Sequence, residues 1–388
     1  MAFLLLSSRF GGKRPTPDTN AIRRTHVSRK MKMRFQKMSR WDRIVVAAIV
    51  LSSSVSFDVE PRSLRQDNSI SRAVFASGRL WLLSDSGDLS SIAPGKKARV
   101  DAGLREPALD ICVSDGQIKA LTCAKEPCKK WTLRTWTDGR WSAGAAIPSL
   151  GDHVAALNCA PGRDTVVTDQ RLVNIVGRMV TSVALSERLK TGVVTSIHAT
   201  VDHVFVGINA GEWGGGLRRI DRRTGKVTVI EKNSTGDLCG GPLNTSCDPV
   251  NGIADEPWKP DCVAIAIGLV HFSPHGRIVE VCKDEVRRIY FKEFGDSGPR
   301  NKQRQSDEPF ETVAFFSLVR AGNELMAAGI DGVYRFDGSA KPKVVPLPKF
   351  EVIGQVGVSF DLPDVVLVLT AINKRQSISG NIPLLVPR

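Results

Sequence analysis

The sequence of 388 residues lacks the patterns that mark several common protein classes. No apolar run reaches the roughly 20 residues that a transmembrane helix needs. Neither Cys-x-x-Cys nor His-Glu-x-x-His occurs, so two common zinc signatures are missing. Beyond residue 57 there is hardly any helical periodicity and no Pro/Ser-rich linker. These absences disfavour a membrane-spanning protein, a zinc site of those kinds and a chain of several linked domains.

Excess positive charge is also missing from most of the chain, although the formal net charge is +14. Residues 1–43 hold twelve lysines and arginines and two acids, a net charge of +10, so the remaining residues carry only +4. A nucleic-acid-binding domain needs a basic face on its folded part. The charge distribution therefore disfavours nucleic acid as a partner.

A cationic segment followed by a short apolar run points to export. The run Ile44–Leu51 follows the basic residues and precedes small residues at Ser54 and Ser56, as in a secretory signal peptide. We therefore expect residues 1–57 to be a basic extension plus a signal peptide, and the mature chain to be periplasmic or secreted without a transmembrane span. A membrane anchor and an organellar presequence are the alternatives. The extension is long for a signal, and four start sites fit the sequence: Met1, Met31, Met33 and Met38.

The cysteines agree with export, because all eight lie within residues 58–388 and an even number in an exported chain predicts disulfides. Eight cysteines allow 105 connectivities. The candidate pairs are Cys123 with Cys128, Cys239 with Cys247, and Cys262 with Cys282. The last pair needs a bulge or a different register, since a hairpin turning at Ser273–Gly276 would place Cys282 opposite Ile267.

A unit of about 40 residues recurs along residues 58–388. Each unit has a short apolar or β-branched run, a turn rich in Gly, Asp and Asn, and a second run; period-2 alternation between such turns predicts half-buried strands. Seven units begin near the following residues: Arg72, Pro107, Gly151, Val193, Asp248, Thr312 and Val352. About 45 residues per unit suit a four-stranded blade. The sequence therefore predicts an all-β protein, a β-propeller of about seven four-stranded blades, although six or eight blades also fit.

Two stretches of the chain resemble a known repeat. Asn323–Gly338 and His203–Lys226 each contain a strand that ends at a small residue, a Gly-rich turn, and a run of apolar residue, Arg, apolar residue and Asp. This order is similar to the repeat of the two-component-regulator type of propeller. The resemblance implies a propeller fold and a sensory or interaction role.

Two loops hold the candidate binding residues. In Gly211–Gly216 the glycines indicate a tight turn rather than a phosphate loop, because neither the Gly-x-Gly-x-x-Gly order nor a following helix is present. A large aromatic in such a loop either packs over the channel or stacks on a ligand. The longer insertion Asn233–Trp258 holds two cysteines, and loops of this length are commonly functional. The predicted ligand-binding residues are Trp213, Asn251, Asp255 and Trp258.

An enzyme is the competing hypothesis, because propellers gather catalytic side chains from several blades around the central channel. For a lyase or hydrolase acting on a glycan or small lactone, the candidates are His203, Glu212, Asp255 and His271. Zinc is not expected at His271 and His275, which flank a Pro-Gly turn instead of lying on one helix face. No cofactor is predicted, although loop oxygens of Asp and Asn would suit calcium.

The sequence thus favours an exported binding module that engages a protein or cell-envelope component through loops on one face, near Trp213 and Asn251–Trp258. A pocket at the axis with a histidine and carboxylates would favour the enzyme. An apolar patch away from the axis would favour a binding role. The oligomeric state does not follow from the sequence.

Overall fold

A computed structural model places the following residues: 69–96, 99–100, 103–124, 127–233, 239–294, 311–339, 341–352, 354–374 and 377–388. The predicted leader, residues 1–57, lies outside this described part. Within it the regular structure is nearly all β, with two short 3-10 helices, η2 (Thr191–Val193) and η3 (Gly211–Trp213). No helix of the described residues combines the length and the apolar character of a membrane span.

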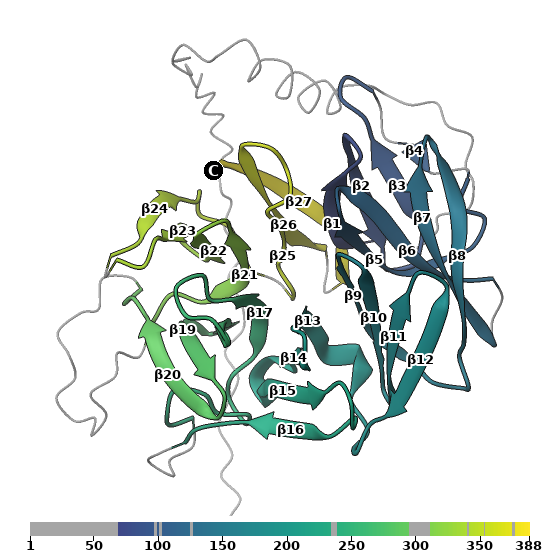
Figure 1. Cartoon of the computed structure of the whole chain (residues 1–388). Helices are drawn as coiled ribbons and strands as arrows, with labels where there is room; N and C mark the ends of the chain where they lie inside the picture. Colours follow the sequence, from purple (N-terminus) through teal and green to yellow (C-terminus); the bar gives the residue numbers. More distant parts are fainter. Residues whose placement is uncertain are drawn as a thin grey trace, which may run out of the picture.

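Seven antiparallel sheets are arranged around one axis in the described part of the chain, as Figure 1 shows. We call them blades one to seven in chain order. Blades one to three comprise β1 (Ile70–Ala76), β2 (Arg79–Ser84), β3 (Leu89–Ile92) and β4 (Arg99–Val100); β5 (Ala108–Ser114), β6 (Gln117–Cys123), β7 (Lys130–Thr137) and β8 (Arg140–Pro148); and β9 (Val154–Ala160), β10 (Arg163–Thr168), β11 (Arg171–Val176) and β12 (Met179–Ala184).

Blades four to six also have four strands, and blade seven has three among the described residues. They comprise β13 (Val194–Ala199), β14 (His203–Asn209), β15 (Gly215–Asp221) and β16 (Val227–Ile230); β17 (Val250–Asp255), β18 (Cys262–His271), β19 (Ser273–Cys282) and β20 (Glu285–Tyr290); β21 (Phe315–Ala321), β22 (Glu324–Gly329), β23 (Gly332–Phe336) and β24 (Lys343–Pro346); and β25 (Gly357–Ser359), β26 (Val365–Lys374) and β27 (Ser377–Pro387).

The first strands of the blades form the inner wall of the ring. Each first strand contacts the first strand of the next blade, and β1 contacts β25, so the ring closes between blades one and seven. At this junction the backbone N–H of Ile70 donates to Oδ1 of Asn381 at 2.6 Å. The predicted seven-bladed β-propeller is confirmed, and the first strands begin within five residues of the predicted unit starts.

The inner strands share a local irregularity. In six of the seven blades the first strand has one residue more than the second strand opposite it, a β-bulge near the start of the strand. The extra residues are Ser71, Leu109, Ala155, Thr195, Asn251 and Phe316. A bulge bends a strand and increases its twist, and it redirects the extra side chain. The repeated bulge therefore bends the inner strand of these six blades and redirects one side chain in each of them.

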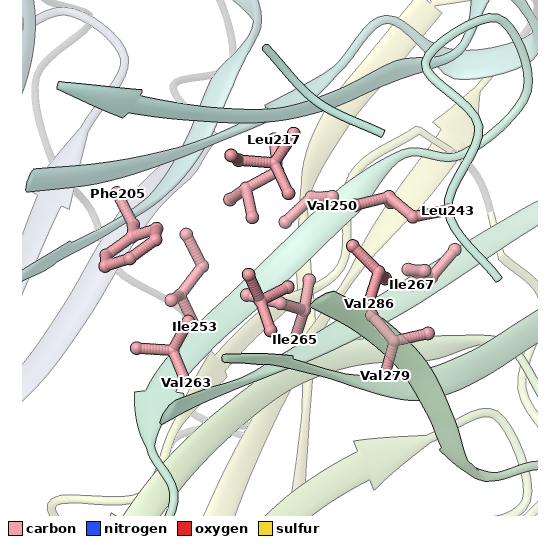
Figure 2. Close-up of a cluster of buried hydrophobic side chains, with 12 residues drawn as sticks. Phe205, Leu217, Leu243, Val250, Ile253, Val263, Ile265, Ile267, Val279 and Val286 are labelled. Atoms are coloured by element: carbon pink, nitrogen blue, oxygen red, sulfur yellow. The ribbon is translucent and has the colours of Figure 1, made fainter. Parts of the chain in front are cut away.

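Burial within a blade differs from the expected half-buried strands. The second strands β10, β18 and β22 are buried on both faces, whereas the fourth strands β8, β12 and β24 are largely exposed. In β18 the alternate residues Val263 and Ile265 join the core shared with blade four, and Ala264 and Ala266 join the core shared with blade six. Figure 2 shows the first of these two cores. Each blade is therefore an apolar layer between two neighbours, and in β18 the large residues contact one neighbour and the small residues contact the other.

Tryptophans fill the junction between the first two blades. Trp81 is fully buried, and the rings of Trp136 and Trp141 meet it edge-on with centroids 5.1 and 5.5 Å away. Trp131 is buried in the next junction, between blades two and three. These four side chains pack between blades.

All eight cysteines are paired in the structure. Three bonds close short segments: Cys123–Cys128, Cys239–Cys247 and Cys262–Cys282. The fourth, Cys112–Cys159, joins β5 to β9 and so links two neighbouring blades. Four disulfides point to an oxidising location, extracellular or periplasmic.

The hairpin that carries Cys282 turns at a different place from the expected one. His271 pairs with Ser273, so the turn is at Phe272 and not within Ser273–Gly276. The tighter turn places Cys262 directly opposite Cys282, without a bulge between these two strands.

Candidate functional site

The propeller has two distinct loop faces. The turns between second and third strands and the connections between blades lie at one end of the strands, which we call the connector face. The turns between first and second strands and between third and fourth strands lie at the other end, the hairpin face. The predicted site residues are divided between the two: Glu212, Trp213 and His271 are on the connector face, and His203, Asp255 and Trp258 are on the hairpin face.

Two aromatic side chains project from neighbouring loops of the connector face. Trp213, at the end of η3 in blade four, is 79% exposed, and Phe272, at the tip of the β18–β19 hairpin in blade five, is 99% exposed. Phe272 has a φ of 61°, a left-handed conformation that bulky residues rarely adopt. We call Trp213 and Phe272 the aromatic pair. These two large rings on adjacent loop tips therefore leave apolar area in contact with water.

A contact between His271 and Glu212 connects the two loops that carry the aromatic pair. The Nδ1 atom of His271 lies 3.1 Å from Oε2 of Glu212. The imidazole of His271 also contacts the ring of Phe272, with centroids 4.2 Å apart. The structure therefore brings together two of the four residues predicted as catalytic, and their contacts orient the tips of the two loops.

The glycines after Trp213 seat this loop on the predicted insertion. Gly214 and Gly216 have φ values of +76° and +79°, and a Cβ atom on them would lie 2.3 Å from the carbonyl oxygen and 2.6 Å from Cγ2 of Thr245, respectively. The N–H of Gly215 donates to that carbonyl of Thr245 at 2.8 Å. The expected tight connection is confirmed: only glycine fits a backbone that approaches another loop this closely.

Residues 239–248 of the insertion are tightly held. Its Asp248 and the Arg277 guanidinium form an ion pair that is almost fully buried. Nε of Arg277 donates to the carbonyl of Pro242 at 2.8 Å, and Oδ2 of Asp248 accepts from the N–H of Asn244 at 2.6 Å. Together with the Cys239–Cys247 bond, these contacts make the loop a fixed support for η3.

Asn251 has a structural role at the inner wall. It is the bulge residue of β17, and its Nδ2 donates to the carbonyl oxygens of Gly268 at 2.7 Å and Phe315 at 2.9 Å. Its Oδ1 accepts from Nδ2 of Asn209 at 2.7 Å. The side chain therefore links blades four, five and six, and both ends of its amide are occupied by the protein.

Asp255 and Trp258 also make contacts between blades. Oδ1 of Asp255 lies 2.8 Å from Nε2 of His198, and this hydrogen bond, with the charge of Arg320, holds the pKa of Asp255 below its usual value despite partial burial. The indole Nε1 of Trp258 donates to the carbonyl of Asn323 at 3.1 Å. Trp258 is partly buried against the core between blades five and six.

The four candidate catalytic residues do not form one site. Glu212 and His271 pair on the connector face, whereas Asp255 pairs with His198, which the sequence had not singled out. His203 lies on the hairpin face at the start of β14. A catalytic constellation needs nucleophile, base and orienting group within hydrogen-bonding reach of one another. The enzyme hypothesis is therefore not favoured.

Metal ligation is limited by the disulfides. Among the described residues, one close group of potential ligand atoms comprises Cys262, Glu280 and Cys282. The two sulfurs are bonded to each other, so neither offers the thiolate that a metal needs. Calcium bound by loop oxygens stays a prediction.

A buried pair of carboxyl groups lies beside that disulfide. Glu280 is fully buried and accepts from Nζ of Lys259 at 2.6 Å and from Arg287. Burial, then the hydrogen bond and charge of Glu280, raise the pKa of Glu256 to about 8. Burial alone would raise the pKa of Glu280 too, but hydrogen bonds from Glu256, Lys259 and Arg287 lower it to about 2. Glu256 is therefore the protonated member that donates to an ionised Glu280.

This pair predicts a stability that falls as the pH rises. Between the unfolded pKa of 4.5 and the folded pKa of about 8, folded Glu256 keeps a proton that the unfolded chain has lost. Going from pH 5.5 to 8.5 should lower the free energy of unfolding by up to about 3 kcal/mol. Urea unfolding at both values measures this difference. Glu256→Gln, which still donates, should abolish the dependence, and Glu351→Gln, on an exposed loop, should retain it; an unchanged slope in Glu256→Gln would contradict this assignment.

Comparisons with known proteins add a likeness of fold. No protein-family model and no curated protein matches the chain. Solved structures similar to it include the extracellular domain of the hybrid two component system BT4673 from B. thetaiotaomicron, at 15% identity and a TM-score of 0.48, covering 82% of this chain and 40% of that one. This chain thus spans about two fifths of the length of that domain.

Two further structures are similar over most of their own length. YCF48 bound to D1 peptide has 12% identity, a TM-score of 0.47, and coverage of 86% of this chain and 96% of that one. The Pan2 WD40 domain of Neurospora crassa has 9% identity, a TM-score of 0.47, and coverage of 78% and 86%. At these identities and scores the likeness bears on neither partner nor activity. The chain is a seven-bladed β-propeller whose structural neighbours include an extracellular two-component-system domain.

Proposed function

We propose that this protein is an exported binding module that engages a partner protein through its connector face. The observation that carries the proposal is the aromatic pair: Trp213 and Phe272 are 79% and 99% exposed on adjacent loop tips. Tryptophan and other aromatic residues are enriched at the centres of protein interfaces, where burial of their rings contributes much of the binding energy.

The support beneath the rings favours binding over accidental exposure. The Glu212–His271 contact and the glycines packed on Thr245 hold both tips in place before a partner arrives. Binding then costs less conformational entropy than it would from mobile loops. The rings also project from the surface instead of lining a recess, which suits a large partner that closes over both.

Replacing the aromatic pair tests the proposal. The double variant Trp213→Ala, Phe272→Ala should lower affinity for the partner at least tenfold, because it removes two exposed rings, while its Tm stays close to that of the parent. Met179→Ala, which removes a 70% exposed side chain at the start of β12, is the matched control. Crosslinked envelope extract, compared by mass spectrometry between the three proteins, gives the measurement.

The supporting result is a partner that the parent and Met179→Ala both retain and that the double variant loses. Retention of every crosslinked protein by the double variant would overturn the proposal. A lipid or polysaccharide recovered in place of a protein, with the same dependence on the aromatic pair, would contradict the assignment of a protein partner.

Export has its own support and its own test. The basic segment before Ile44–Leu51 and the small residues Ser54 and Ser56 are typical of a signal peptide, and four disulfides suit a periplasmic or secreted protein. The intact mass of the protein from its native source should correspond to a chain that begins near Asp58. A chain in that source that retains residues 1–57 would contradict cleavage.

A further inference from the structure

The hairpin face contains a cleft of about 560 Å³ between blades three and four. Three arginines from two turns line it: Arg163 at the start of β10, and Arg222 and Arg223 directly after β15. A cleft of this size is within the range of small-molecule sites. It lies at the opposite end of the strands from the aromatic pair, so a proposal for this cleft does not rest on the proposed protein partner.

Arg222 is a half-buried cation held only by neutral groups. Its Nε donates to the carbonyl of Thr200 at 2.9 Å, and its Nη1 donates to Oδ1 of Asn174 at 2.5 Å and to Oγ1 of Thr165 at 3.2 Å. Burial, and then the neighbouring charge of Arg163, lower the pKa of Arg222. Within the described part of the chain it forms no ion pair. Removing a guanidinium from water without a counterion is costly, and the contacts to neutral acceptors fix the orientation of this one.

The charges around the cleft leave one positive charge unbalanced. Arg163 and Arg223 are exposed, and neither has a carboxylate within 4 Å among the described residues, although the charge of Arg223 contributes to lowering the pKa of Asp221. Two acids, Asp202 and Asp221, also line the cleft, and Oδ1 of Asp221 accepts from the backbone and hydroxyl of Thr224 within its own turn. Three guanidinium groups against two carboxylates leave a net charge of +1, which one carboxylate would neutralise. Arginine binds a carboxylate with two parallel hydrogen bonds.

The rest of the lining is suited to a hydroxylated ligand. Asn174, Thr181 and His203 offer both donors and acceptors, and Val176 and Val201 supply apolar contact. We propose that this cleft binds a small sugar acid, with its carboxylate on the arginines and its hydroxyl groups on the neutral polar side chains. His203, a candidate catalytic residue from the sequence, is then a ligand contact.

Calorimetric titration with D-glucuronate tests the site directly, and D-glucose is the uncharged control. The parent should bind glucuronate saturably and should not bind glucose at the same concentrations. Absence of saturable glucuronate binding, or equal binding of glucose, would overturn the proposal. Inorganic phosphate serves as a third probe; phosphate binding tighter than glucuronate binding would overturn the assignment of a carboxylate.

Single substitutions locate the binding. Arg163→Gln and Arg223→Gln alter exposed side chains and should each lower the affinity for glucuronate at least tenfold, with an unchanged circular dichroism spectrum. Arg105→Gln, on the exposed connection between β4 and β5, should leave the affinity unchanged. Arg222→Lys keeps the charge but loses the contacts to Thr200, Asn174 and Thr165 that fix the orientation of the guanidinium group, so it should also lower the affinity at least tenfold. Equal affinity in Arg223→Gln and Arg105→Gln would place binding elsewhere and contradict the proposal.

Discussion

Apolar packing between neighbouring blades is the interaction on which the whole structure depends. A blade such as blade five places the large residues of β18 in one junction and the small residues in the other, so it has no core of its own. Hydrophobic burial is complete only when every blade has a neighbour on each side, which is the physical reason for closing the ring. The bulged inner strands, with the hydrogen bonds and ion pairs of their side chains, then fix the positions of the blades around the axis.

Polar side chains at the inner wall link neighbouring blades in addition to this apolar packing. Asp110 illustrates how: one of its oxygens pairs with Arg72 at 3.2 Å, and the other accepts from the N–H of Leu157 at 2.8 Å, so one carboxylate spans three blades. Asn251 does the same for blades four to six. Buried polar groups of this kind add directional constraints that apolar packing lacks. They set the relative position of the loops, and both candidate binding surfaces lie where loops of two blades meet.

The blades could be predicted from the sequence because each unit repeats the same local pattern. In that pattern, runs with period-2 alternation lie between turns rich in Gly and Asp. The roles of individual side chains could not be predicted, because they depend on which residues of the neighbouring blades lie next to them in the closed ring. Asn251 looked like a ligand contact, yet its partners are the carbonyls of Gly268 and Phe315, which only the closed ring brings together. Phe272 was missed because Pro274 and Gly276 after it suggested a later turn. The aromatic side chain then appeared to belong to a strand.

The bond between Cys112 and Cys159 was also missed, although its signal was present. The two cysteines are 47 residues apart, close to one repeat unit, and residues one unit apart on first strands are neighbours in a propeller. Peptide mapping of the unreduced protein therefore tests the central claim, the closed packing of successive blades, most directly. The account predicts a proteolytic fragment in which Cys112 is bonded to Cys159. Either cysteine found free, or bonded to one of the other six, would contradict it.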